Sequence, residues 1–248
     1  MFPIRDHNPS GRTPYVTYGL IAANVLVFFM TTWMIPGGPA LERFYMFWAL
    51  VPDEVSQGQR LVTLVTSMFL HGGLMHLGGN MLFLWIFGDN LEDEMGHLRF
   101  LGFYLAAGVG AGLVHVVAAP GSAVPTVGAS GAIAAVMGGY LLLFPRARVD
   151  ILVILIIFFR IFAVPAWMML GLWFGFQFLG GIGADPEAGG VAYWAHAGGF
   201  VIGFLLCLPL WVRRGGAAFW SRTRGLPPHP QATYGISKTR IPKVPRRR

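Results

Sequence analysis

Four polar side chains lie inside long apolar stretches of this sequence. Ser130 lies in "TVGASGAIAAVMGGYLLLFP", residues 126–145, which contains no charged residue. His76 and Asn80 lie four residues apart in "HGGLMHLGGNMLFLWIFGDN", and His196 lies in "YWAHAGGFVIGF". Polar groups are costly in an apolar environment, so each of these requires an explanation. A hydroxyl, two imidazoles and an amide are together the groups that acyl transfer by a serine nucleophile needs.

A serine hydroxyl becomes a strong nucleophile when a neighbouring base accepts its proton. Neutral imidazole suits this task because it titrates near neutral pH. The oxyanion that follows needs preorganised donors, which an Asn amide, a second His and the free N–H groups of a helix N-terminus can supply. The predicted membrane spans that carry these residues, about 71–88, 128–144 and 191–212, contain no Asp or Glu that could orient His196. A dyad of Ser130 and His196 is therefore predicted rather than a triad.

Two other interpretations of the same residues remain open. A serine flanked by glycines in a membrane helix more often allows close helix packing than catalysis, and His76 with Asn80 can form a structural polar pair. His71, His76 and His196 can in principle bind a metal, but they lack the carboxylate and the HExxH spacing of a specific zinc site. We therefore expect neither a metal nor another cofactor.

The elements that carry these residues follow from composition. Of 248 residues, 55% are apolar and 12% are charged, whereas roughly a quarter of a soluble domain is charged. Uncharged windows of about 20 residues are long enough to cross a bilayer as helices. We predict an all-α fold, a polytopic membrane bundle of six helices. The expected spans cover about residues 15–35, 71 or 74 to 88, 98–119, 128–144, 164–181 and 191–212.

Two segments outside these spans are not assigned as crossings. The connection 36–60 mixes aromatic and charged residues, which predicts an amphipathic element in the membrane interface. Residues 151–162 are interrupted by Arg160 and are interpreted as interfacial or partly buried. A further crossing in this region is the alternative.

The distribution of basic residues orients the six spans. Most Lys and Arg residues fall on one side of the bilayer, whereas connections 120–127 and 182–190 on the other side contain none. Because Lys and Arg favour the cytoplasmic side, both termini are predicted to be cytoplasmic. The second, fourth and sixth spans then begin at the outer face. This topology brings the four polar residues of the first paragraph to a similar depth below the outer surface.

Small residues predict close contact between the fourth and sixth spans. Gly131 lies next to Ser130, and Gly199 and Gly203 form a G-x-x-x-G pattern on the sixth span. Such surfaces let helix backbones approach closely in lipid. Gly199 lies three residues after His196 and therefore on the same side of the helix. Packing through these glycines is expected to bring His196 toward Ser130.

Three regions are expected along the chain. Residues 1–13 form a cytoplasmic segment, residues 14–212 form the membrane domain, and residues 213–248 form a basic, Pro-rich, disordered tail. The formal net charge is +7, and ten of the 18 Lys and Arg residues follow Val212. We interpret this cluster as a tail that lies near anionic lipid, and we expect no binding to nucleic acid.

Three stretches together resemble a known family. "HGGLMHLGGNMLFLWIFGDNLED", "GASGAIAAVMGGY" and "AHAGGFVIGF", in this order, resemble the motifs of the rhomboid family of intramembrane serine proteases in its bacterial form. The resemblance covers about residues 60–212. It implies a six-helix membrane bundle with Ser130 as nucleophile and His196 as general base. It also implies that His76, Asn80 and the backbone N–H of Ser130 form the oxyanion site.

The resemblance extends to supporting positions, with two departures. His71 matches the upstream histidine of the family motif, and Gly128 matches the glycine two residues before the nucleophile. Some members carry an aromatic residue four places after the nucleophile, packed under the base, where this chain has Ala134. The Trp-Arg pair found in the first outer connection of some members is absent from "FYMFWALVP".

The expected function follows from the resemblance. It implies an integral protein of the bacterial cytoplasmic membrane that cleaves transmembrane helices of substrate proteins near their outer ends. The alternative is a catalytically inactive rhomboid-like protein that binds client transmembrane helices.

Overall fold

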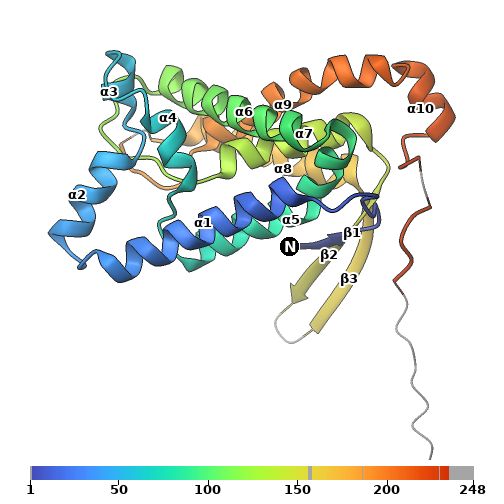
Figure 1. The fold of residues 1–248 in the computed structure, drawn as a ribbon, viewed down its shortest axis with the longest axis horizontal. Helices are drawn as coiled ribbons and strands as arrows, with labels where there is room; N and C mark the ends of the chain where they lie inside the picture. Colours follow the sequence, from blue (N-terminus) through green and yellow to red (C-terminus); the bar gives the residue numbers. More distant parts are fainter. Residues whose placement is uncertain (1, 156–157, 186, 229, 235–248) are drawn as a thin grey trace, which may run out of the picture.

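Six long helices run side by side and form the body of the molecule (Figure 1). The computed structural model describes residues 2–155, 158–185, 187–228 and 230–234. The six helices are α1 (Tyr15–Met34), α5 (Leu74–Met95), α6 (His97–Ala118), α7 (Ser130–Leu143), α8 (Ala166–Gly183) and α9 (Tyr193–Arg213).

The polytopic helical bundle predicted from composition is confirmed. Helices α1, α6, α8 and α9 are each long and apolar enough to cross a bilayer. Their ends lie within two residues of the predicted ones. Helix α7 is also apolar but shorter, with 14 residues. Helix α5 continues past the predicted end at Gly88 to Met95, through the acidic cluster.

A buried carboxylate explains why α5 does not end at its acidic residues. Glu92 is 1% exposed and accepts hydrogen bonds from the backbone N–H groups of Val16 and Thr17 at 2.8 and 2.7 Å. The Thr17 hydroxyl donates to it as well, at 2.7 Å. The first N–H groups of a helix lack partners within the helix and carry partial positive charge. Glu92 therefore caps the start of α1, and α5 extends far enough to carry it there.

Helix α7 is the centre of the bundle. Twelve of its 14 residues are buried, and it packs against α5, α6 and α9. A short uncharged helix is stable there because its backbone is bonded internally and other helices cover its side chains. Its C-terminal end leads toward the β-sheet described below. Its N-terminal residue, Ser130, consequently lies at the other end of the helix.

The connection between α1 and α5 contains α2 (Pro39–Trp48), α3 (Pro52–Ser56), α4 (Thr63–Thr66) and a 3₁₀ turn, η1 (Ser67–Phe69). Helix α2 buries none of its residues in the bundle, and two of its aromatic side chains, Phe47 and Trp48, are exposed. This is the geometry expected for the predicted interfacial element. Leu50 and Thr126 exchange two backbone hydrogen bonds of 3.0 and 2.8 Å. They tie this connection to the loop that leads into α7.

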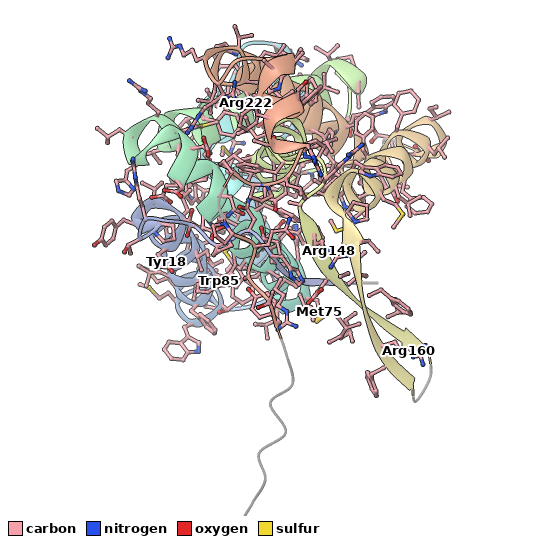
Figure 2. All side chains as sticks on the ribbon, turned by 90° about the vertical axis from the view of Figure 1, so that its right-hand side faces the viewer. Tyr18, Met75, Trp85, Arg148, Arg160 and Arg222 are labelled. Atoms are coloured by element: carbon pink, nitrogen blue, oxygen red, sulfur yellow. The ribbon has the colours of Figure 1, made fainter. Side chains whose placement is uncertain are left out.

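A three-stranded antiparallel sheet was not anticipated from the sequence. It is formed by β1 (Phe2–Asp6), β2 (Arg148–Leu155) and β3 (Phe158–Pro165), in the order β1-β2-β3. The described part of residues 151–162 therefore belongs to a β-hairpin and not to a further crossing. Its Ile, Val and Phe residues favour strands, but a uniformly apolar run hides the alternation that identifies one. Figure 2 shows Arg160 toward the end of the hairpin that points away from the helices.

The sheet is held by a charged cluster at β2. Asp150 is 4% exposed and accepts hydrogen bonds from Arg5 at 2.7 Å and from His7 at 2.8 Å. Burial alone would raise the pKa of Asp150, but these hydrogen bonds hold it below the ordinary value. Its contribution to stability is therefore lost only as the pH falls below the ordinary range of an aspartate.

Asp6, the last residue of β1, gives the protein a pH dependence of opposite sign. Burial raises the pKa of Asp6 from 3.8 to about 8, against the hydrogen bond that the Tyr140 hydroxyl donates to it at 2.7 Å. Between these values the folded state keeps a proton that the unfolded chain has lost. The free energy of unfolding therefore falls as the pH rises through this window.

We expect Asp6→Asn to remove this fall in the free energy of unfolding with rising pH. The Asn amide carries no charge, and its oxygen still accepts a hydrogen bond from Tyr140. The unfolding midpoint in detergent should exceed that of wild type at pH 8, by a margin that grows steadily from pH 5. Asp53→Asn, at a carboxylate on α3, is the control and should follow wild type. Parallel profiles for Asp6→Asn and wild type would contradict this assignment.

A short helix, α10 (Ala217–Thr223), follows α9. The Trp220 indole N–H donates to the backbone oxygen of Leu142 at 2.9 Å, which attaches α10 to the end of α7. The predicted tail, residues 213–248, thus begins with an ordered segment. Its last part, residues 235–248, lies outside the described residues.

Candidate active site

Ser130 is the first residue of α7, and the backbone before it approaches a histidine closely. Gly128 has a φ of +127°, and a Cβ atom there would lie 2.8 Å from His76 Nε2. Both the conformation and the space therefore require glycine. The Gly128 N–H donates to Ser67 O at 2.9 Å, which fixes the loop. The first N–H groups of a helix lack partners within it. They are available as donors beside Ser130.

His196 of α9 lies against Ser130, and its Nε2 atom is 2.7 Å from Ser130 Oγ. Glycines make this approach possible. A Cβ atom on Gly199 would lie 2.2 Å from Gly131 O, and one on Gly203 would lie 2.0 Å from Ala135 O. The backbones of α7 and α9 are thus in direct contact along the glycine-lined faces. His196, on the same side of α9 as Gly199, is pressed toward the start of α7.

Two residues of α8 complete the surroundings of His196, and sequence reasoning missed both. Gln177 Oε1 lies 2.8 Å from His196 Nδ1. The Trp173 ring lies beside the imidazole, with the ring centroids 5.9 Å apart and the planes tilted by 31°. One signal was present in the sequence. Gln177 has the only amide side chain in α8, where a polar group is costly.

His76 and Asn80 of α5 line the same cavity as Ser130 and His196. The Nε2 edge of the His76 ring faces Gly128. The Nδ1 atom of His76 lies 3.4 Å from the backbone nitrogen of Gly72, which donates to it. Asn80 is 8% exposed, and its Nδ2 has no hydrogen-bond partner among the described residues. A buried donor without a partner is costly. At the edge of a cavity that also contains Ser130, it is available to an oxygen of a bound molecule.

His71 lies behind His76 and not in contact with Ser130. It is 1% exposed, and its ring packs edge-on against His76 with centroids 5.1 Å apart. Its backbone oxygen accepts a hydrogen bond from the Tyr45 hydroxyl at 2.8 Å. His71 therefore supports the position of the His76 ring by packing.

A cavity of about 890 Å³ opens around these groups. Residues from five helices and from the loops before α7 and α9 line it. His115 of α6 is among them and pairs with the Thr126 hydroxyl at 3.0 Å. The walls are mainly apolar and include Met75, Phe83 and Trp173. The cavity can therefore hold an apolar segment against a few polar groups, as ligand sites commonly do.

No metal-binding cluster is present among the described residues, since no three His, Cys, Asp or Glu side chains are suitably grouped there. His71, His76 and His196, the set considered from the sequence, do not converge on one point. The expectation that neither metal nor cofactor is needed remains a prediction.

Known proteins resemble this chain over its membrane core. The mitochondrial rhomboid protein 1 of Saccharomyces cerevisiae is 30% identical over 197 residues, 77% of this chain and 51% of its own length. The rhomboid protease GluP of Bacillus subtilis is 38% identical over 129 residues, 52% of this chain and 24% of its own. The human mitochondrial presenilin-associated rhomboid-like protein is 35% identical over 138 residues, 54% of this chain and 34% of its own.

The chain thus spans about half of the yeast protein and a quarter to a third of the other two. The family model of the rhomboid domain matches residues 58–213. This range includes α5 to α9 and the motif residues of all three quoted stretches. The chain is an integral membrane protein, and it belongs to the rhomboid family.

Proposed function

We propose that this protein is an intramembrane serine endopeptidase that cleaves transmembrane helices of other membrane proteins near their outer ends. The observation that carries the proposal is the 2.7 Å contact between Ser130 Oγ and His196 Nε2 inside a largely apolar cavity. A hydroxyl and an imidazole at hydrogen-bond distance are the nucleophile and general base of acyl transfer. Membership of the rhomboid family supports the same reaction type.

In the proposed first step, Ser130 Oγ attacks the scissile carbonyl carbon while its proton passes to His196 Nε2. The resulting oxyanion is held by the Asn80 amide, by the His76 ring and by N–H groups at the start of α7. Removing one such donor typically costs about 2.7–4 kcal/mol of transition-state stabilisation. His196 then returns the proton to the leaving amine, and the C–N bond breaks.

In the second step, water attacks the acyl-enzyme and gives its proton to His196. The ester bond breaks, and Ser130 recovers a proton from His196 as the acid product leaves. Water must reach the cavity from the side of the loops before α7 and α9, because hydrocarbon supplies none. A substrate helix must also unwind locally, since a helical peptide bond is shielded. Segments with weak helix propensity and small residues are the preferred substrates in this proposal.

We place the protein in the cytoplasmic membrane of a bacterium, with both termini in the cytoplasm. Excess Lys and Arg at one side of the predicted spans supports this orientation. Residues 1–13 and 213–248 flank the membrane domain, 14–212, on that side. The basic tail is positioned to contact anionic headgroups.

The test uses the purified full chain in liposomes with a membrane-anchored test substrate. We expect cleavage near the outer end of the substrate helix, undiminished by a chelator. A fluorophosphonate probe should label Ser130, as peptide mapping by mass spectrometry can show. Labelling at another residue, or loss of cleavage in chelator, contradicts the proposal. Stable capture of the substrate helix without cleavage or labelling would favour the client-binding alternative.

A further inference from the structure

The second nitrogen of the His196 ring has a specific partner on a different helix. Gln177 of α8 places its amide oxygen 2.8 Å from His196 Nδ1, while His196 Nε2 lies 2.7 Å from Ser130 Oγ. We propose that Gln177 is a positioning residue that holds His196 in the tautomer and orientation that activate Ser130. This inference rests on the proposed function of the same site. It adds a third residue to a predicted dyad.

The argument begins with the hydrogen atoms of the imidazole. An amide oxygen only accepts hydrogen bonds, so the His196 nitrogen that faces it must carry the proton. A neutral imidazole has one N–H, which is then at Nδ1. Nε2 is left with a free lone pair, directed at Ser130 Oγ. Gln177 thus selects the one neutral tautomer in which His196 is able to accept the serine proton.

Trp173 supports the same ring on its face. Trp173 and Gln177 are four residues apart and therefore share one side of α8. With the tryptophan beside the ring and the amide at its edge, rotation of His196 about its side-chain bonds is restricted. Ala134 is too small to provide such support from α7. Both contacts that orient the imidazole come from α8.

The contact with His196 explains why α8 carries an amide side chain at Gln177. The other side of α8 exposes large apolar side chains, as expected for a helix surrounded by lipid, among them Leu172, Phe176 and Leu179. Gln177 is partly buried, toward α9. Near it, Gly180 and Gly181 pack against Tyr193 and Trp194 of α9. An amide inside a membrane helix is costly unless it is paired, and its partner here is His196. The geometry of Ser130 and His196 therefore depends on the packing of α8 against α9.

Gln177→Met tests the inference because it keeps length and volume but removes the acceptor. We expect kcat to fall by about 10- to 100-fold, the loss typical when the partner that orients a metal-bound imidazole is removed. KM should be unchanged. Labelling of Ser130 by a small fluorophosphonate should slow by a similar factor, because it needs the base but no substrate helix. Leu179→Met, the same replacement on the lipid-facing side of α8, should match wild type.

Gln177→Glu is the conservative variant. A carboxylate also accepts from Nδ1–H, so it should keep most of the wild-type kcat. It also stabilises the imidazolium, so the acid limb of the kcat/KM profile should move to higher pH. The other titratable side chains of the cavity are His76, His115, Asp185 and Tyr193. None of them changes between the variants, so a shift confined to Gln177→Glu reports on His196.

A readout independent of activity is the ¹⁵N spectrum of the His196 ring in detergent. It should show the Nδ1–H tautomer in wild type and a mixture in Gln177→Met. A rise in KM with unchanged labelling would overturn the inference and make Gln177 a substrate contact. Wild-type behaviour of both Gln177 variants would overturn it too. The proposed function fails separately, if wild type is not labelled at Ser130; the ring tautomer still decides the role of Gln177 in that case.

Discussion

Replacing either Ser130 or His196 with alanine is expected to lower kcat by roughly 10⁴-fold or more. In the proposed mechanism the two residues exchange one proton across their 2.7 Å contact, so neither acts without the other. The double variant should therefore be no slower than the slower single variant. If the two residues acted independently, its fold-loss in kcat would instead be the product of the two single losses. KM should change little, because the apolar side chains of the cavity, and not these two polar ones, are expected to hold the substrate. Residual turnover would come from the oxyanion donors and from binding.

The measurement is initial rates of cleavage in liposomes for wild type, both single variants and the double variant at equal protein content. Ser221→Ala is the matched control, because Ser221 lies on α10, and its hydroxyl donates within its own helix, to Ala217 O at 3.0 Å. It should behave as wild type. Additive losses in the double variant, or a His196→Ala rate close to wild type, would show that the pair does not work as one unit.

The largest expected effect on stability comes from replacing one hydrogen atom of Gly203, on α9, with a methyl group. In Gly203→Ala, the new Cβ atom would meet three backbone atoms of Ala135, at 2.0 Å from O and 2.4 Å from C and Cα. A backbone cannot move aside as a flexible side chain does, so α7 and α9 must separate. We expect the free energy of unfolding to fall by about 3 kcal/mol, the upper end for overpacking of a core. Activity per folded molecule should fall too, since His196 lies on the displaced helix.

Gly175→Ala is the control for this experiment, because nothing lies within 4 Å of the Cβ position at Gly175 on α8. Alanine favours a helix over glycine, so this variant should be neutral or slightly more stable. Unfolding midpoints of both variants in the same detergent compare the effects directly. Equal midpoints would mean that the contact between α7 and α9 is looser than the geometry requires.

The helices themselves were predictable because their signals are local. An apolar window of about 20 residues without charges can satisfy its backbone in a bilayer only as a helix. For this reason the ends of α1, α6, α8 and α9 were predicted to within two residues. The end of α5 was missed by seven residues because acidic residues normally end a span. Here one of them, Glu92, pairs with the start of α1, about 75 positions away.

The sheet was missed for a different reason. Its strand β1, residues 2–6, pairs with β2, residues 148–155, and no local sequence pattern in either segment predicts this pairing. The hairpin region is apolar at nearly every position, so neither the period of a strand nor that of a helix is visible. Only pairing across the fold decides between an interfacial segment, a crossing and a hairpin.

The sequence alone determined that this chain is a membrane bundle, and it predicted a similar depth for Ser130, His196, His76 and Asn80. It also indicated the glycine faces that bring α7 and α9 together. Composition, periodicity and topology suffice for this, because a bilayer constrains where each helix begins and which residues it tolerates. The tertiary structure decided how each helix is rotated and tilted about its axis, which hydrophobicity does not specify. That rotation turns Gln177 and Trp173 toward His196. In our proposal it makes α8, rather than α7, the helix that orients the His196 ring.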